Sequence, residues 1–254
     1  MLLRESLLPE IGGREAASGW TLANYTELAD PAYAFYFYDT LRLAVLSAAI
    51  AVLLGAPLAR AAARTKRRSV RRAILLLLVG MLFMSAVARI YAVQVSFART
   101  GPLAFVAPWL GIRPGSPGFA VMMVVTGLVH FILPAIALML VGTFQNIDAR
   151  LEEAAASLGA SRARLLLDVT LPLAMPGLAA AFTLGFAMGI SNFVVPLILG
   201  RGVVVFVTNL IYVRVSQIAD YPSGAALAVL MLLAASAAVF ALARLVRGRG
   251  PRLA

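Results

Sequence analysis

The amino-acid sequence predicts an all-α integral membrane protein with five transmembrane helices. Apolar residues make up 62% of the chain, charged residues only 13%, and the mean hydropathy is +0.93. These values are far from those of a soluble domain of this length. The charges are also segregated, which leaves uncharged stretches of the roughly 20 residues that a helix needs to cross the hydrocarbon core. The formal net charge of +11 is therefore assigned to helix orientation in a bilayer, and we expect membrane lipid, not nucleic acid, as a partner.

The transmembrane domain is expected to cover residues 41–246, between an N-terminal tail of residues 1–40 and a C-terminal tail of residues 247–254. The start of the chain does not look like a secretory signal, because acidic residues interrupt its short apolar runs. The five apolar segments are approximately 41–62, 73–97, 119–143, 173–199 and 223–245.

The distribution of Lys and Arg predicts the orientation of these spans. Fourteen of the 22 basic residues lie in the connection after the first segment, in the loop 146–172 and at the end of the chain, against seven on the opposite side. The richer side is expected in the cytoplasm. Five spans then place the N-terminus outside and the C-terminus inside. The N-terminal tail agrees, with six acidic residues against two arginines before Leu41.

Small residues in the first and fourth segments predict close helix contacts. Gly177, Ala181, Gly185 and Gly189 recur at four-residue spacing in the fourth segment, and the first has a similar alanine-rich stripe. Such stripes let helix backbones approach closely in lipid, either in a static bundle or at an interface that moves. Pro196 is expected to kink or end the fourth span.

The loop 146–172 carries a short helix between two long apolar segments. Asp148 is placed as its N-cap, and Glu152 and Glu153 favour the positive end of the helix dipole. Three alanines give high helix propensity with little bulk, and Gly159 is a natural stop. A second short helix is expected to end at Pro172, with the fourth span starting near Pro176. Such a small-residue helix fits a groove on a partner protein, whereas the plainer alternative is an amphipathic helix lying on the bilayer.

The order and spacing of this loop closely resemble the EAA loop of the permease subunits of ATP-binding-cassette (ABC) importers. The pattern is Glu-Ala-Ala, three residues, Gly, nine residues, an aliphatic residue, any residue, and Leu-Pro. The resemblance identifies the ATPase-coupling residues as Glu152, Glu153, Ala154, Ala155, Gly159, Leu171 and Pro172. Softer similarity to the spermidine/putrescine-type branch extends over residues 20–25, 89–92, 127–134, 192–196, 209–212 and 220–228.

This resemblance implies a type I ABC importer permease core in a prokaryotic inner membrane. Its partners would be a dimer of ATP-binding subunits, a second permease subunit, expected to be a different chain, and an external solute-binding protein. The chain would be a transport subunit and not an enzyme, with ATP bound only by its partners, since the sequence lacks a phosphate-binding Gly-x-x-x-x-Gly-Lys-Ser/Thr loop. The solute would be a polyamine, phosphonate, opine or similar small molecule. Members of this branch usually have one more membrane helix before residue 20.

Polar residues within the spans are candidates for the solute pathway. Arg89 and Tyr91 are expected near the external end of the second span, lining the mouth or anchoring the helix to lipid and backbone. His130 is expected to bond a carbonyl that Pro134 leaves free, with a proton or solute role as the alternative. Ser191 and Asn192 are the preferred pathway pair. All eleven acidic residues fall outside the expected spans, which favours a neutral or anionic solute, or a partner permease that supplies negative charge.

Two other functions are considered. A stand-alone secondary transporter or channel is the main alternative, but it predicts inverted repeats and intramembrane carboxylates, and neither is evident. An intramembrane enzyme would need a nucleophile and a base, and His130 is the single histidine. With no cysteine in the chain, no metal site is expected.

Overall fold

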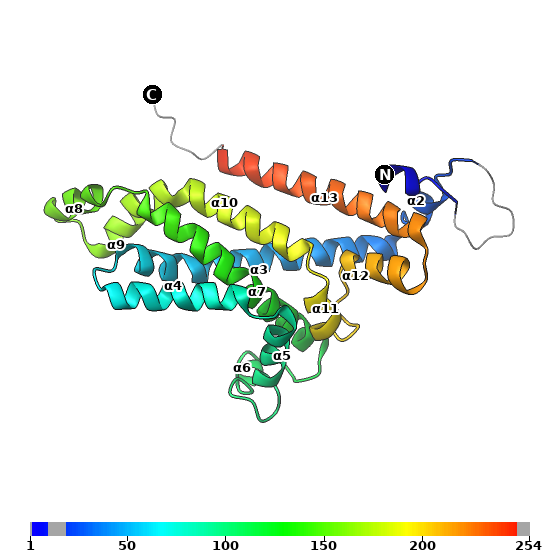
Figure 1. The fold of residues 1–254 in the computed structure, drawn as a ribbon, viewed down its shortest axis with the longest axis horizontal. Helices are drawn as coiled ribbons and strands as arrows, with labels where there is room; N and C mark the ends of the chain where they lie inside the picture. Colours follow the sequence, from blue (N-terminus) through cyan, green and yellow to red (C-terminus); the bar gives the residue numbers. More distant parts are fainter. Residues whose placement is uncertain (1, 10–18, 248–254) are drawn as a thin grey trace.

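The computed structural model describes residues 2–9 and 19–247, and this part of the chain is helical and contains no strand. The helices form an elongated bundle (Figure 1). The short helix α8 (Ala149–Ser157) stands at one end of the bundle, and α2 (Ala23–Glu27) lies at the other. Residues 10–18 of the expected N-terminal tail and residues 248–254 of the C-terminal tail lie outside the described residues.

Within the described residues, four helices are long and apolar enough to cross a membrane. They are α3 (Pro31–Arg64), α7 (Pro117–Gln145), the helix Leu165–Ile190 and α13 (Tyr221–Arg247). A fifth span is present if α4 (Arg68–Phe83) and α5 (Ala86–Ser96) are counted together, although they meet at an angle of 106°. The expected second span is therefore not one straight helix. Its apolar run continues through the bend, so hydropathy could not reveal the break.

Two further span boundaries differ from the sequence-based expectation. The first of the long helices, α3, begins at Pro31 and not near residue 41. Asp30 caps this helix by accepting a 2.8 Å hydrogen bond from the Ala32 N–H. Asp39 consequently lies in the N-terminal part of α3 and is 5% exposed, because the helix extends N-terminally beyond the expected span. The fourth span ends at Ile190, and Pro196 belongs to a separate short helix, α11 (Val194–Leu199).

Helix α7 is the centre of the bundle and packs against α3, α4, α5, α10 (Leu171–Ile190) and α11. Its fully buried Leu128, Ile132, Ile136 and Leu140 recur at four-residue spacing, which places them on one face of the helix. Because α7 contacts nearly every long helix, this apolar row forms the common core.

The small residues predicted to mediate contacts lie at the interface between α3 and α10. A Cβ atom added at Gly189 would lie 3.2 Å from the Ala44 Cβ, and one added at Gly185 would lie 3.4 Å from the Ala48 Cβ. Both alanines are fully buried. The prediction of close backbone approach between the first and fourth segments is confirmed.

An ion-pair cluster holds the end of the bundle opposite α8. The Arg214 guanidinium, in the π-helical turn η2 (Val213–Gln217), lies 2.7 Å from Glu27 and 3.1 Å from Asp220. It also donates to the Tyr33 hydroxyl at 2.9 Å. Burial lowers the pKa of Arg214, but interactions with Tyr33 and Glu27 raise it overall, so this side chain stays charged. The cluster joins α2, α3, η2 and the start of α13.

The remaining short helices lie at the periphery of the bundle but contribute buried residues to its core, among them Ile90, Val93 and Ala107. α5 and α6 (Val106–Trp109) project away from the long helices (Figure 1). α1 (Leu2–Glu5) packs on α13, and α12 (Val207–Tyr212) packs on α13 and α3.

Candidate functional site

The loop 146–172 forms the short helix expected from its local signals. The Asp148 carboxylate accepts a 2.9 Å hydrogen bond from the Arg150 N–H and caps α8. Gly159 ends the helix with φ of +82°, a conformation that residues with a side chain rarely adopt. The predicted cap and glycine stop are both confirmed.

Helix α8 has no buried residue. Glu153, Ala154 and Ala156 are exposed, while Leu151 and Leu158 are 47% and 89% exposed. A helix of 9 residues is only marginally stable without packing, because helices shorter than about 12 residues gain too little from their own hydrogen bonds. The exposed α8 therefore presents a surface suited to coverage by another protein.

Glu152 points inward and attaches α8 to the membrane helices. Its Oε1 atom accepts a 3.0 Å hydrogen bond from the Thr170 hydroxyl and lies 3.3 Å from Arg64 Nη2. Its Oε2 atom lies 3.6 Å from Arg60 Nη2. The neighbouring Glu153 faces solvent, since consecutive residues point about 100° apart around a helix. Two residues grouped together by the sequence pattern thus occupy different surfaces.

Sequence reasoning did not identify the partners of Glu152. Arg60 and Arg64 are one helical turn apart at the end of α3, and Arg64 also donates a 2.9 Å hydrogen bond to the Ile147 carbonyl. Their four-residue spacing was the available signal, because it places two cations on one helix face. Thr170 carried no signal, since its contact with Glu152 depends on how the loop folds back.

The end of the coupling loop runs into the fourth span without a break. α9 (Arg162–Arg164) leads into the π-helical turn η1 (Leu165–Thr170), and α10 begins at Leu171. Pro172 lies in the first turn of α10 and Pro176 lies inside it. The expectation that Pro172 ends a separate helix is therefore wrong. A proline near a helix start is tolerated because its missing N–H has no required acceptor there, and the π-helical turn supplies the local adjustment.

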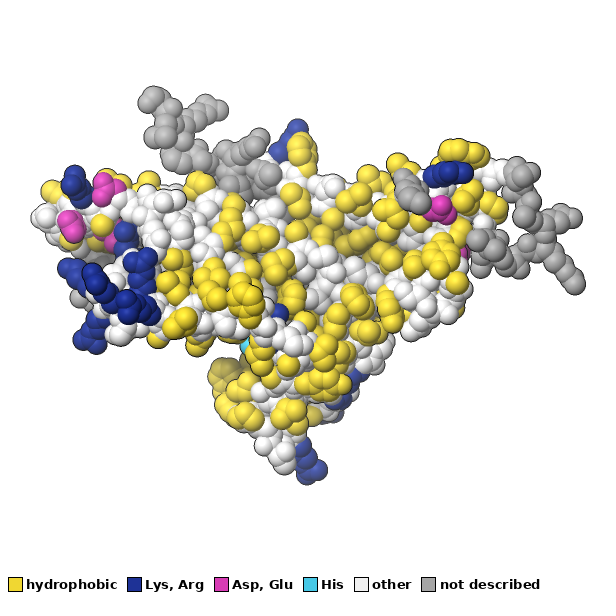
Figure 2. Space-filling model, in the orientation of Figure 1, with side chains coloured by type: hydrophobic (Ala, Val, Ile, Leu, Met, Phe, Trp, Pro, Cys, Tyr) yellow, Lys and Arg dark blue, Asp and Glu magenta, His cyan; other side chains and the backbone are white. Residues whose placement is uncertain are grey.

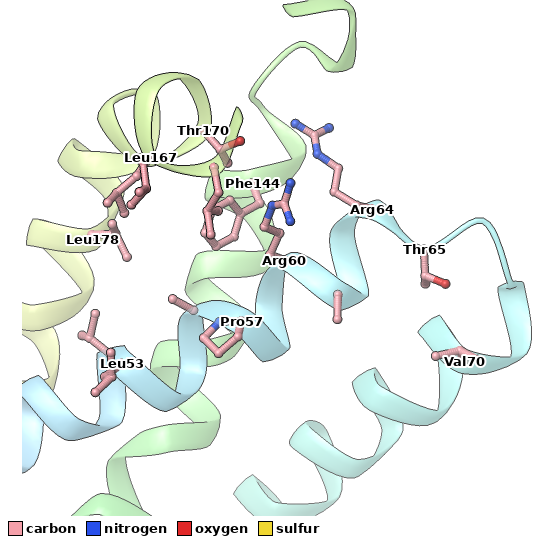
Figure 3. A pocket seen from close by; sticks show the side chains of 15 residues that line it. Leu53, Pro57, Arg60, Arg64, Thr65, Val70, Phe144, Leu167, Thr170 and Leu178 are labelled. Carbon is pink, nitrogen blue, oxygen red and sulfur yellow. The ribbon is translucent and has the colours of Figure 1, made fainter. Parts of the chain in front are cut away.

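A groove of about 770 Å³ separates the end of α3 from α4 and from the η1–α10 segment. We call it the α3–α10 groove. Figure 3 shows Leu53, Leu167 and Leu178 on one side of the groove, and Arg60 and Arg64 away from these leucines, toward Thr65 and Val70. Its lining residues include Leu53, Pro57, Arg60, Arg64, Thr65, Val70, Phe144, Leu167, Thr170, Leu171 and Leu178.

Arg89 is buried within the chain. It is 6% exposed, and its guanidinium carbon lies 4.8 Å from the centre of the Phe131 ring on α7. Its Nε and Nη1 atoms have no hydrogen-bond partner among the described residues. Tyr91 is 54% exposed, so the two side chains do not share one environment. The half-buried His130 ring makes no hydrogen bond to any described residue, and the expected bond to a carbonyl freed by Pro134 is not found.

Ser191 and Asn192 lie where the backbone breaks between α10 and α11. The Ser191 hydroxyl donates to the Ala187 carbonyl at 2.8 Å, and Asn192 Oδ1 accepts from the Val195 N–H at 2.9 Å. Asn209 of α12 donates to the Phe193 carbonyl at 2.8 Å. These polar side chains therefore satisfy backbone groups at an interrupted helix. Asn209, 4% exposed, was not among the predicted site residues.

The fold and this site together define a class of protein. A multi-pass helical bundle carries an exposed short helix, α8, which is joined to α3 by ion pairs and to the start of the fourth span by a hydrogen bond. This arrangement is typical of a membrane transport subunit that receives force from a partner.

Comparison with known proteins identifies the family. Residues 51–250 match the family described as "Binding-protein-dependent transport system inner membrane component". The chain is 31% identical over 236 residues to the spermidine/putrescine transport system permease protein PotB of Escherichia coli (strain K12), covering 92% of this chain and 84% of PotB. It is 27% identical to the inner membrane ABC transporter permease protein YdcU of the same organism, covering 81% of this chain and 70% of YdcU. The chain belongs to this family of multi-pass inner-membrane permease subunits of ABC importers, which are transport proteins and not enzymes.

Solved structures show the same fold. A chain of the bacterial alginate ABC transporter, in complex with its alginate-pentasaccharide-bound periplasmic protein, matches with a TM-score of 0.74 at 16% identity over 91% of this chain and 84% of that one. A chain of the inward-facing MetNI methionine ABC transporter matches with a TM-score of 0.65 at 17% identity over 87% of this chain and 98% of that one. These TM-scores establish the type I permease fold. The family membership does not favour the alternative of a stand-alone secondary transporter.

Proposed function

We propose that this permease forms half of the translocation pathway for a small organic cation of the polyamine class. The solute is delivered by an external binding protein, the other half of the pathway is a second and different permease chain, and a dimer of ATP-binding subunits supplies the energy. The likeness to PotB over 92% of the chain supports the solute class. The observation that carries the mechanism is the uncovered helix α8 and its attachment through Glu152.

The coupling step follows from the contacts of α8. An ATP-binding subunit covers the side of α8 that carries the exposed Glu153 and Ala154 and the partly buried Ala155, and moves this helix when ATP binds. Glu152 transmits the displacement to α3 through Arg60 and Arg64, and to the continuous helix Leu165–Ile190 through Thr170. Gly159 provides the sharp turn between them, and Leu171 and Pro172 begin the driven span. The membrane helices then tilt to alternate access between the two faces.

The second permease packs against the face of α10 that this chain leaves exposed. Only 17% of the apolar window in the helix Leu165–Ile190 is buried within the described chain, compared with 61% for α7. Leu173, Ala180, Leu184 and Ala187 are exposed at helical spacing. Ser191 and Asn192 lie at the end of this face and remain the proposed pathway residues, with Arg89, Tyr91 and His130 on the neighbouring elements as further candidates.

A polycationic solute requires negative charge along its path. Asp39 and Asp220 are buried in this chain, but Arg42 lies 2.8 Å from Asp39 and Arg214 lies 3.1 Å from Asp220. Both carboxylates are therefore neutralised within the chain. The charge that attracts the solute comes from the second permease and from the external binding protein.

The docking step is tested by placing a large side chain on the exposed face of α8. Ala154→Trp is expected to abolish co-purification of the ATP-binding subunit and ATP-dependent uptake, because the indole holds the partner away from the helix. The matched control is Ala98→Trp, which adds the same bulk at an exposed site away from the loop. Uptake of radiolabelled spermidine and putrescine is measured in cells that express all partner subunits. Normal ATPase co-purification with Ala154→Trp would contradict the docking role, whereas uptake of neither polyamine by the unaltered complex would contradict the solute class.

A further inference from the structure

We infer that the α3–α10 groove is a binding site for an anionic phospholipid of the cytoplasmic leaflet, with an acyl chain along its apolar walls and the phosphate at Arg60 and Arg64. The inference rests on the proposed function in one respect, which is the cytoplasmic placement of this end of the bundle.

The groove has the size and lining of a ligand site. Its volume of about 770 Å³ falls within the range of roughly 300–1,000 Å³ that is typical of small-molecule sites. Leu53 and Leu167 are 72% and 59% exposed, and both face the groove in Figure 3. Apolar side chains of this size, open to the membrane, are suited to contact with hydrocarbon. The polar groups are confined to one end.

The arginines at that end have unused capacity for an anion. Arg60 and Arg64 share the single carboxylate of Glu152, which leaves one positive charge in excess. The Nε atoms of both arginines are shielded from solvent and make no hydrogen bond within the described part of the chain. A phosphate diester offers several acceptor oxygens and binds guanidinium groups through charge-assisted hydrogen bonds. It would therefore satisfy donors that the protein leaves without partners.

The adjoining segment 66–72, which covers the connection between α3 and α4 and the start of α4, adds further positive charge. The five exposed basic residues of this segment form no ion pair with any described carboxylate. Several of them lie at the start of α4, where the helix dipole disfavours cations and favours an anion. Figure 2 shows this basic patch at the same end of the molecule as α8. Its members are Lys66, Arg67, Arg68, Arg71 and Arg72.

The combination of an apolar groove with a basic end selects a lipid over a free anion. Inorganic phosphate would use the arginines but leave the apolar walls uncovered. Basic pockets between membrane helices on the cytoplasmic side bind lipid head groups, since that leaflet carries anionic lipids. A lipid seated here would contact α3, α4 and η1 together, and so would hold the helices through which α8 acts.

The test uses the purified full chain in detergent, supplied with equal amounts of phosphatidylglycerol and phosphatidylcholine of the same acyl chains. Bound lipid is counted by native mass spectrometry. We expect phosphatidylglycerol to be retained in preference, and Arg60→Gln to weaken its binding roughly tenfold, as the loss of one charge-assisted contact implies. Arg113→Gln, an exposed arginine away from the groove, is the charge control.

A second variant tests the apolar part of the site without changing charge. Leu167→Trp narrows the groove and is expected to reduce phosphatidylglycerol binding, whereas Leu232→Trp, at a similarly exposed leucine of α13, is expected to leave it unchanged. Equal retention of the two lipids would overturn the inference. So would full competition by inorganic phosphate, or loss of the complex with the second permease in Leu167→Trp without any loss of lipid. The docking variant Ala154→Trp should bind lipid normally, so failure of this inference is separable from failure of the proposed coupling.

Discussion

The side chain of Glu152 connects α8 to the membrane helices of this permease. It is 15% exposed and contacts Arg60 and Arg64 of α3 and Thr170 of η1. Two of these contacts join α8 to α3, and the third joins it to η1, which leads into α10. Glu153 has no such contact and faces outward. The two glutamates therefore lie on different sides of α8, Glu152 toward the membrane helices and Glu153 toward solvent.

Glu152→Gln should lower the stability of the loop, because the substitution removes the negative charge and therefore both ion pairs. The amide oxygen can still accept a hydrogen bond from the Thr170 hydroxyl. The expected cost is about 1–3 kcal/mol, between that of an exposed pair and that of a fully buried one. The measurement is the midpoint of thermal unfolding of the purified chain in detergent. Glu153→Gln, the exposed neighbour, should change stability by less than about 0.5 kcal/mol. An equal effect from both substitutions would show that Glu152 is not anchored as described.

At the scale of elements, the contact between α3 and α10 depends on small residues, glycine and alanine. Gly185 faces Ile136 of α7 as well as Ala48 of α3, and a Cβ added there would lie 2.5 Å from Ile136 Cδ1. Because α10 is continuous with η1, this tight packing also fixes the position of the loop 146–172. The small residues of α10 thus help to position the loop 146–172 as well as to hold the bundle together.

Gly185→Val is expected to destabilise the fold by about 1–3 kcal/mol, since extra methyl groups in a packed interface force side chains and backbone to shift. The control is Gly142→Ala in α7, where an added Cβ meets no atom within 4 Å. Detergent-solubilised yield and thermal unfolding of the two variants provide the comparison. If Gly185→Val unfolds at the same temperature as the unaltered chain, the interface is looser than the structure indicates.

On the scale of the whole molecule, charge divides the bundle into two ends. The basic patch and α8 lie at one end, and the Arg214 cluster with Glu27 and Asp220 lies at the other (Figure 2). Basic residues near membrane helices are retained in the cytoplasm. The first end is therefore proposed to be cytoplasmic, which also places α8 where ATP-binding subunits are found.

The orientation can be measured by cysteine labelling, because the natural chain contains no cysteine. Ser216→Cys, exposed on η2, should react with a membrane-impermeant maleimide in intact cells. Ser69→Cys, exposed at the start of α4, should react only after the membrane is opened. The reverse pattern would invert the proposed topology and would remove α8 from the reach of ATP-binding subunits.

Much of the coupling loop was predictable because its signals are local. Asp148 caps a helix within two residues of itself, and Gly159 ends it through its own backbone freedom. The partners Arg60 and Thr170 were not predictable, since they meet Glu152 only after chain segments distant in sequence have packed together. The same holds for the continuous helix through Pro172, whose π-helical turn no local pattern indicated.

The sequence by itself determined the all-helical membrane class, the approximate positions of the spans and the short helix α8, because hydropathy and helix caps act within a few residues. Tertiary structure alone decided that Glu152 turns inward and that the run 73–97 bends by 106°. The bend separates α4 from an α5 that packs on α7 and α11, with Arg89 over Phe131. These features follow from contacts between distant segments, which neither composition nor spacing can specify.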